Sequence, residues 1–549
     1  MISLQGLGFR YHAAGPRVLH DISLTINAGE KVLIAGRNGA GKTTLSKILS
    51  GLLPSAERSL LEGGYFFQGK KIGSYSRREI ASRIAVLFQD FEAQIVSSSV
   101  AEEMLFYPMN IGMGYRAARQ KMISIAEQFG IAGLLSRDMH ELSGGEKQKT
   151  AFFSLLAVDP DLLILDEPFT DIEPSSQEYV LDFLGGTSFK GSLILFEQSL
   201  DYGRHFDRIV ILHAGAILYD GDESGAYGRA LLDKAGLDMP GLRKLFPGAA
   251  VATVKDAAGI AARQYAFDNE AYAALLREPA RGTATPIIRV RGLSFTYKGM
   301  PGNVLENINL DIQQGDFVAI LGSNGSGKTT LAKCIAGILR PRAGEVIYKG
   351  AKVKAGDIGY VYQNPDNQIF AETVFDEIAF ALRMKKLPAG EIKKRVDAML
   401  ETMGLAAVAF QDPFTLPKGD RQKVACASIL AAEPDVIILD EPTTGLDFPS
   451  LSEMMRIIKG LNDKGKTVLM ITHSMEAAAS FGRTVLAVKN GHILFYGPCR
   501  DFFNDADLLS ESRASRTDIM KLSLELNNRP LLNAGEFLQC WKKQLERAE

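Results

Sequence analysis

The chain has 549 residues, of which 46% are hydrophobic and 23% charged, and its formal net charge is -2. This length allows two or more domains with full cores, and the balanced charge gives no reason to expect a nucleic-acid partner. No apolar run approaches the roughly 20 residues of a membrane-spanning helix, and the first residues lack a signal-peptide pattern. Four scattered cysteines without a CxxC pair favour a reduced, cytoplasmic setting. We therefore expect any membrane role to come through a partner chain.

The first half carries a phosphate-binding motif. An alternating stretch from Leu19 to Ile26 predicts a strand, and Val32 to Ile34 predict a buried strand that leads into GRNGAGKT. In such a loop the glycines aim backbone N–H groups at phosphate oxygens, the lysine reaches the β and γ phosphates, and the threonine hydroxyl binds Mg²⁺. The motif predicts nucleotide binding by Gly36, Asn38, Gly39, Gly41, Lys42, Thr43 and Thr44, with Thr43 as a Mg²⁺ ligand.

The motif recurs as GSNGSGKT, between a predicted strand at Phe317 to Leu321 and a predicted helix from Lys328 to Lys333. The two loop lysines are 286 positions apart, whereas motifs further along are offset by 274, so the first half carries twelve extra residues in between. A repeat of this size indicates two similar domains rather than a solenoid. The second set of expected nucleotide-binding residues is Gly322, Asn324, Gly325, Gly327, Lys328, Thr329 and Thr330, with Thr329 on Mg²⁺.

A tyrosine and a glutamine occupy equivalent places in both repeats. Tyr11 and Tyr297 each precede their loop lysine by 31 positions. We expect their rings to stack on a nucleotide base, and an ordinary strand tyrosine is the alternative. Gln89 and Gln363 each follow an apolar strand, where the side-chain amide can contact Mg²⁺ or the attacking water.

Further motifs complete the first half. LSGGEKQ opens a predicted helix, where Ser143, Gly144 and Gly145 offer a hydroxyl and free N–H groups for a second anion site. LLILDE then places Asp166 and Glu167 at the end of an apolar strand. The aspartate is suited to hold Mg²⁺, and the glutamate to accept a proton from the attacking water or to orient it.

The second half repeats the acidic motif as VIILDE, with Asp440 and Glu441. The ordered series of motifs resembles that of the ATP-binding-cassette (ABC) ATPases over nearly all of residues 1–225 and 286–500. The resemblance implies an α/β fold of two tandem P-loop domains, each with a mixed-sheet core, an antiparallel β subdomain and a helical subdomain. It implies ATP and Mg²⁺ as ligands and head-to-tail pairing, with each ATP between one phosphate loop and the opposite LSGGEKQ-type signature. We place the domains at 1–225 and 287–503, with a linker containing short helices at 226–286 and a helical tail at 504–549.

A narrower resemblance concerns the segments after the two glutamines. QNPDNQ followed by TVFDEIAF is similar to the ATPases of energy-coupling-factor (ECF) transporters, which import vitamins or metal ions. The resemblance implies a peripheral subunit on the cytoplasmic side of the membrane. Its partners would be an integral transport subunit and a substrate-binding membrane subunit. We expect the segments from Asp90 to Phe106 and from Asn364 to Phe380 to receive helices of the membrane partner.

Two other functions compete with this interpretation. A soluble tandem ABC ATPase that acts on ribosomes or nucleic acid is the main alternative, and it predicts a long basic arm or a metal-cluster segment. The linker instead has eight basic and eight acidic residues from Asp222 to Arg281. An exporter ATPase is disfavoured by the QNPDNQ pattern.

The repeats differ at two places that matter for catalysis. The second half has LPKGDRQ where the first has LSGGEKQ, so that Pro417 lacks both a hydroxyl and an N–H, and Lys418 replaces a glycine. His473 would contact the γ-phosphate in this family, and Gln198 stands at the matching place of the first half. Head-to-tail pairing would put both departures at one ATP site and would leave the Glu441 site complete.

Overall fold

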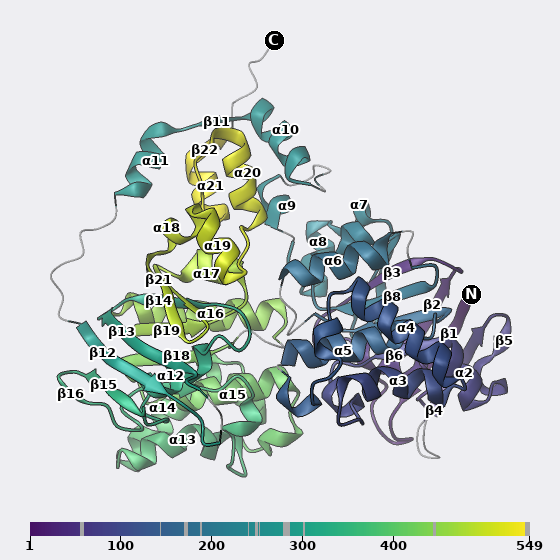
Figure 1. The fold of residues 1–549 in the computed structure, drawn as a ribbon, viewed down its shortest axis with the longest axis horizontal. Helices are drawn as coiled ribbons and strands as arrows, with labels where there is room; N and C mark the ends of the chain where they lie inside the picture. The colour runs from purple at the N-terminus through teal and green to yellow at the C-terminus, as the bar shows by residue number, and fades with distance from the viewer. Residues whose placement is uncertain are drawn as a thin grey trace. The chain divides into compact units, whose positions relative to one another are not determined.

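The computed structural model describes residues 1–54, 60–142, 144–169, 174–186, 189–239, 241–246, 251, 253–277, 286–299, 302–442 and 446–543. The chain forms two compact units, Met1–Pro240 and Gly241–Glu549, which we describe one at a time. Figure 1 labels most of their helices and strands.

The first unit contains two sheets. An antiparallel sheet has the strand order β2-β1-β4-β5, and a mixed sheet has the order β10-β9-β3-β8-β7-β6, with only β9 and β10 antiparallel in the described part. The strands are β1 (Ile2–Arg10), β2 (Leu19–Ile26), β3 (Lys31–Ala35), β4 (Leu60–Phe67), β5 (Lys70–Lys71), β6 (Ile84–Leu87), β7 (Leu162–Asp166), β8 (Ser192–Glu197), β9 (Arg208–His213) and β10 (Ala216–Gly221).

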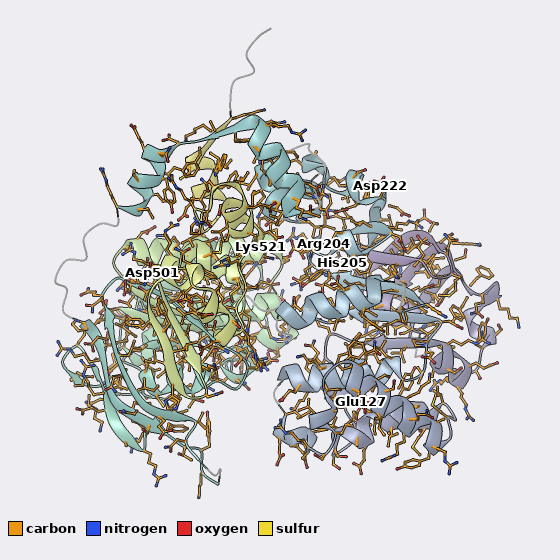
Figure 2. The ribbon with its side chains drawn as sticks, turned by 45° about the horizontal axis from the view of Figure 1, so that its top comes forward. Glu127, Arg204, His205, Asp222, Asp501 and Lys521 are labelled. Carbon is orange, nitrogen blue, oxygen red and sulfur yellow. The ribbon has the colours of Figure 1, made fainter. Side chains whose placement is uncertain are left out.

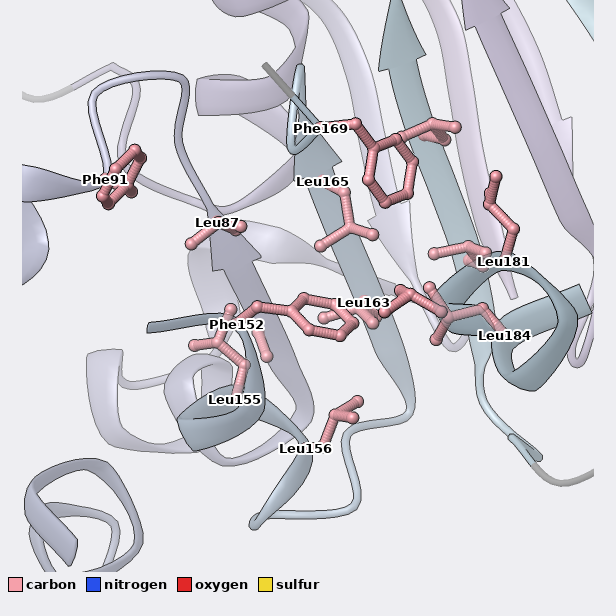
Figure 3. Packing of buried hydrophobic residues seen from close by; sticks show 14 of the residues in the cluster. Leu87, Phe91, Phe152, Leu155, Leu156, Leu163, Leu165, Phe169, Leu181 and Leu184 are labelled. Carbon is pink, nitrogen blue, oxygen red and sulfur yellow. The ribbon is translucent and has the colours of Figure 1, made fainter. Parts of the chain in front are cut away.

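Helices cover the mixed sheet, whose central strands β3, β7 and β8 are apolar between their end residues because both faces are buried. Leu163 and Leu165 of β7 pack against Phe152 of one helix and Leu181 of another (Figure 3). The helices of this unit are α1 (Lys42–Leu49), α2 (Arg77–Arg83), α3 (Val100–Asn110), α4 (Tyr115–Gln128), α5 (Gly144–Leu156), α6 (Pro174–Gly185), α7 (Glu223–Ala226) and α8 (Arg229–Ala235).

The second unit repeats this plan, as the sequence repeat predicted. Its antiparallel sheet has the order β13-β12-β15-β16 and its mixed sheet the order β17-β18-β19-β14-β20-β21. The strands are β12 (Pro286–Phe295), β13 (Leu305–Gln313), β14 (Phe317–Leu321), β15 (Ala343–Tyr348), β16 (Ala351–Lys352), β17 (Gly359–Val361), β18 (Val436–Asp440), β19 (Thr467–Ile471), β20 (Thr484–Lys489) and β21 (His492–Pro498). The helices of this repeat are α12 (Lys328–Ile335), α13 (Val374–Met384), α14 (Ala389–Thr402), α15 (Lys418–Leu430), α16 (Phe448–Asp463) and α17 (Met475–Phe481).

Segments that precede and follow the second repeat form one small module, which we call the linker–tail module. Strand β11 (Tyr265–Phe267) pairs antiparallel with β22 (Trp541–Lys543), a sheet that the sequence analysis did not anticipate. A shared core joins the two segments and includes Phe246, Phe537 and Trp541. Helix α18 (Cys499–Asn504) ends the second repeat. The helices of the linker and tail are α9 (Gly241–Leu245), α10 (Val254–Gln264), α11 (Asn269–Leu276), α19 (Ala506–Ser512), α20 (Asp518–Asn527) and α21 (Ala534–Cys540).

Polar contacts reinforce the linker–tail module. The guanidinium of Arg529, in the tail, lies 5.1 Å from the ring centroid of Phe267 and 5.4 Å from that of Tyr272, both in the linker. Arg500 on α18 forms an ion pair of 2.7 Å with Glu536 on α21. The tail therefore holds the linker as well as the end of the second repeat.

The surface of both units is charged. Glu127 on α4, Asp501 on α18 and Lys521 on α20 are among the exposed charged side chains (Figure 2). Among the described residues, no helix combines the length and the hydropathy that crossing a bilayer requires.

Candidate nucleotide sites

The first phosphate loop joins β3 to α1, as predicted. Gly41 has φ 100°, and a Cβ there would approach Leu19 to 2.7 Å, so only glycine fits this turn. Helix α1 begins at Lys42 without a side-chain cap, which leaves its first N–H groups for an anion. The Lys42 ammonium donates to the carbonyls of Gly36 (2.7 Å) and Arg37 (3.2 Å), which keeps it at the loop.

The second phosphate loop has the same construction between β14 and α12. Gly327 has φ 102°, and α12 also begins without a side-chain cap. The Lys328 ammonium donates to the carbonyls of Gly322 (2.8 Å) and Ser323 (3.0 Å). Both loops are therefore shaped for phosphate by the same backbone geometry.

The two predicted base-stacking tyrosines lie close to these loops. The hydroxyls of Tyr11 and Thr44 are 3.0 Å apart, and those of Tyr297 and Thr330 are 3.1 Å apart. Phe9 packs edge-on against the ring of Tyr11, which remains 41% exposed. This arrangement leaves ring surface available, and stacking on a base stays a prediction.

In the first unit, side chains from four motifs meet at Glu167. The amides of Gln89 and Gln198 donate to one carboxylate oxygen at 2.7 and 2.8 Å, and Lys42 lies 3.3 Å from the other. Glu167 has φ 51°, an unusual backbone for a non-glycine residue, and its N–H donates to Phe196 O at 3.0 Å. This turn aims the carboxylate toward the phosphate loop, where it forms the ion pair with Lys42.

The equivalent residues meet in the second unit. Glu441 has φ 49°, accepts a hydrogen bond of 3.1 Å from the Gln363 amide, and lies 3.2 Å from Nε2 of His473. The predicted catalytic residues Glu167, Gln198, Glu441 and His473 are thus gathered, two in each unit. The catalytic and metal-binding roles of these residues and of the two glutamines stay predictions.

The predicted Mg²⁺ residues fit a divalent cation. Asp166 is fully buried, and apart from the nearby hydroxyl of Thr43 no described residue stabilises its carboxylate through a hydrogen bond. Burial and the neighbouring Glu167 raise the pKa of Asp166 to about 7, although Thr43 and Lys42 oppose this shift. A bound divalent cation would neutralise the negative charge of this buried carboxylate. In the second unit Thr329 donates to Asp440 at 3.2 Å, which brings the two predicted ligands together.

The structure adds two residues to the sites that the sequence analysis missed. Glu197, next to Gln198, has a pKa raised well above its usual value by burial and by Glu167. The hydroxyl of Tyr360 donates to Asp440 at 2.7 Å. A position-by-position comparison of the repeats would have shown both, because their counterparts are Thr472 and Val86.

The two signature segments begin equivalent helices. Helix α5 begins at Gly144, and Gly145 is buried, whereas Ser143 lies outside the described residues. A Cβ at Gly144 would meet no atom within 4 Å. In the second unit Pro417 precedes α15 without a side-chain cap, and Lys418 is its exposed first residue. Because the equivalent turn of the first unit has room for a Cβ, we expect the Lys418 side chain to crowd a bound phosphate rather than residues of its own unit.

Comparison with known proteins identifies the family of the chain. Residues 19–170 and 305–444 match the ABC transporter family. A provisionally named ABC transporter ATP-binding protein of Caldanaerobacter subterraneus subsp. tengcongensis is 35% identical over 99% of this chain and 99% of its own length. A similarly named protein of Methanosarcina acetivorans is 32% identical over 96% of this chain and 90% of its own. The solved structure of cbiO1 from Clostridium perfringens, part of the ABC transporter complex cbiONQ, is 32% identical, covers 41% of this chain and 94% of its own, and has a TM-score of 0.37. The chain belongs to the ABC transporter family, as an ATPase with two nucleotide-binding domains that bind ATP with Mg²⁺.

Proposed function

We propose that this ATPase powers an ECF-type importer, in which it drives uptake of a vitamin or metal ion through a separate membrane protein. It would act as a peripheral subunit on the cytoplasmic side of the cell membrane, bound to an integral transport subunit that works with a substrate-binding membrane subunit. The observation that carries this proposal is an exposed apolar patch on the second unit, in the segments that follow Gln363.

We call this surface the docking patch and define it as Phe370, Phe380, Met384 and Phe410. These side chains are 59%, 42%, 68% and 81% exposed. The rings of Phe370 and Phe380 lie 4.7 Å apart, and Phe410 stacks on Phe375 at 5.9 Å. Exposed aromatic residues that pack on one another are typical of protein interfaces, and these follow the QNPDNQ segment that resembles ECF ATPases.

The first unit offers a similar surface, in which Val96 and Phe106 match Phe370 and Phe380 and Met109 lies next to the counterpart of Met384. Val96, Phe106 and Met109 are 60%, 47% and 47% exposed. The buried carboxylate of Glu103 accepts hydrogen bonds from the N–H groups of Val96 (3.1 Å) and Ser97 (2.9 Å), and Glu377 does the same for the segment at Phe370. Each exposed segment is therefore anchored to its helix, which suits it to receive a partner helix.

The segment that leads into the docking patch contacts the catalytic glutamate and the signature helix of the second unit. Asp366, in the segment before the patch, forms an ion pair of 2.8 Å with Arg421 on the signature helix α15. Gln363, three residues earlier, holds Glu441. Movement of a docked helix would thus be transmitted through Gln363 to the catalytic glutamate Glu441, and through Asp366 to the signature helix α15.

The proposed mechanism uses head-to-tail pairing of the two units. Ser143, Gly144 and Gly145 would complete the site of Lys328, and LPKGDRQ would face the site of Lys42. Glu441 would accept the proton of the attacking water while Gln363 orients its carboxylate. His473 would hold the γ-phosphate and the water in line with Glu441, and Lys328 would hold the phosphates. Mg²⁺, when bound, neutralises charge on the phosphate oxygens. Pairing on ATP and separation after hydrolysis would then move the docked membrane subunit.

Capture of the full chain from detergent-solubilised membranes of its own cells tests this function. We expect a very hydrophobic membrane protein to copurify with the wild type and to be lost with a Phe370→Ser, Phe380→Ser, Met384→Ser variant. Ile338→Ser, which changes an apolar residue of 38% exposure outside the patch, is the matched control and should retain the partner. Recovery of ribosomes or nucleic acid without a membrane protein would instead support the alternative function.

Both phosphate loops should bind nucleotide. Because each loop is preformed and each lysine is held at its loop, titration with a non-hydrolysable ATP analogue should give about two nucleotides per chain, one for each loop. Lys42→Ala and Lys328→Ala should each reduce the number to about one. A stoichiometry of one in the wild type would mean that the altered signature prevents binding rather than turnover.

A further inference from the structure

The second unit holds its metal-binding aspartate with a tyrosine that the first unit lacks. Tyr360 lies on β17, which runs parallel to β18 with Tyr360 opposite Ile438. Because side chains alternate along a strand, Asp440 projects from the same face of β18 as Ile438, and the tyrosine is long enough to reach it. The hydroxyl of Tyr360 donates to Oδ2 of Asp440 at 2.7 Å, and Tyr360 is only 5% exposed.

The two carboxylate oxygens of Asp440 therefore have different hydrogen-bond partners. Oδ2 is occupied by Tyr360, whereas Oδ1 faces the hydroxyl of Thr329 at 3.2 Å, beside the phosphate loop. A carboxylate held through one oxygen cannot rotate freely, so its other oxygen stays directed at the cation site. Residues that hydrogen-bond to metal ligands in this way orient the ligand, and their loss commonly weakens metal binding.

The first unit has the same strand register but no such donor. Val86 on β6 lies opposite Ile164 of β7, and Asp166 follows Ile164 by two residues, as Asp440 follows Ile438. Valine carries no polar atom and cannot donate to Asp166, whereas the hydroxyl of Thr43, the counterpart of Thr329, stabilises the charged form of this carboxylate. The two units thus differ in the side chain that faces this aspartate from the neighbouring strand, which is Tyr360 in one and Val86 in the other.

We propose that Tyr360 is a positioning residue that preorients Asp440 for Mg²⁺ and makes the nucleotide site of the second unit the tighter Mg²⁺ site. Val86 then leaves the first unit with the weaker metal site. This third difference between the units is independent of the signature and of His473, and it does not depend on the identity of the membrane partner.

The test measures metal binding directly. In a Lys42→Ala background, which restricts nucleotide to the second site, Mn²⁺ binding with a non-hydrolysable ATP analogue is followed by electron paramagnetic resonance. Tyr360→Phe keeps the ring and should weaken Mn²⁺ binding by about tenfold. The ATPase of the single Tyr360→Phe variant should need a correspondingly higher Mg²⁺ concentration and recover when it is supplied.

Tyr362→Phe is the matched control. Its ring packs edge-on against Tyr360 at 4.9 Å, and the first unit has Phe88 at the same place, so the change leaves the Tyr360–Asp440 bond intact. In the Lys42→Ala background, we expect the Tyr362→Phe variant to bind Mn²⁺ with the same affinity as the chain that keeps Tyr362. An unaltered Mn²⁺ affinity in Tyr360→Phe, or an ATPase loss that Mg²⁺ does not restore, would show that Tyr360 has only a structural role.

Discussion

Glu441→Gln should nearly abolish ATP hydrolysis by the chain assembled with its proposed membrane partner, whereas Glu167→Gln should leave most of this activity. Loss of a general base typically costs ~10²–10⁴-fold in rate. Glu441 lies 3.2 Å from His473, a side chain that can hold a phosphate oxygen and the attacking water together. Glu167 is held by two glutamine amides, and under head-to-tail pairing it would work opposite Pro417, which offers no donor. Losing one donor to the developing charge costs ~10²–10³-fold, so the first site would add little to the total rate.

Steady-state phosphate release by the two variants decides this prediction. A matched pair is available because each glutamate has the same backbone conformation and the same contact with a preceding glutamine. Nucleotide binding, measured in parallel, should be unchanged in both variants. Equal loss in the two would mean that the sites act in strict alternation or that Lys418 replaces the missing donor. A greater loss in Glu167→Gln would refute the head-to-tail assignment.

Phe537→Ala should destabilise the linker–tail module by about 3–5 kcal/mol, the usual range for removing a buried phenylalanine. Phe537 is fully buried on α21, stacks on Trp541 at 5.8 Å, and packs edge-on against Phe246 of the linker at 6.2 Å. Its removal therefore opens a cavity between segments almost 300 positions apart in the sequence. Hydrogen exchange should accelerate in the linker helix α10 as well as in the tail helix α20, which pack together.

The neighbouring residue provides the control. Leu538 is 48% exposed, so Leu538→Ala should change stability by less than about 0.5 kcal/mol. Exchange in α12, at the second phosphate loop, should stay unchanged in both variants. If Phe537→Ala left exchange in α10 as it is in the wild type, the tail would not hold the linker.

Most of the nucleotide-binding architecture could be predicted from the sequence because it depends on local chemistry. A buried strand, a glycine turn and a helix start are encoded within about ten residues of Lys42 and again of Lys328. The predicted strand Leu19–Ile26 and the helix that opens at the signature are confirmed. The offset between repeats likewise predicted that the same motifs would recur in a second domain, and the shared sheet order bears this out.

Side-chain partners across strands required the tertiary structure. Tyr360 and Asp440 are 80 positions apart, and only the parallel register of β17 and β18 brings the hydroxyl to the carboxylate. The pairing of β11 with β22 joins short segments that carry no strand signal of their own, because each becomes stable only against the other. The sequence by itself thus determined the phosphate loops, the repeat and the family, whose signals are local. The packing of distant segments decided how Asp440 is held and how the tail is joined to the linker, because those contacts exist only once the chain has folded.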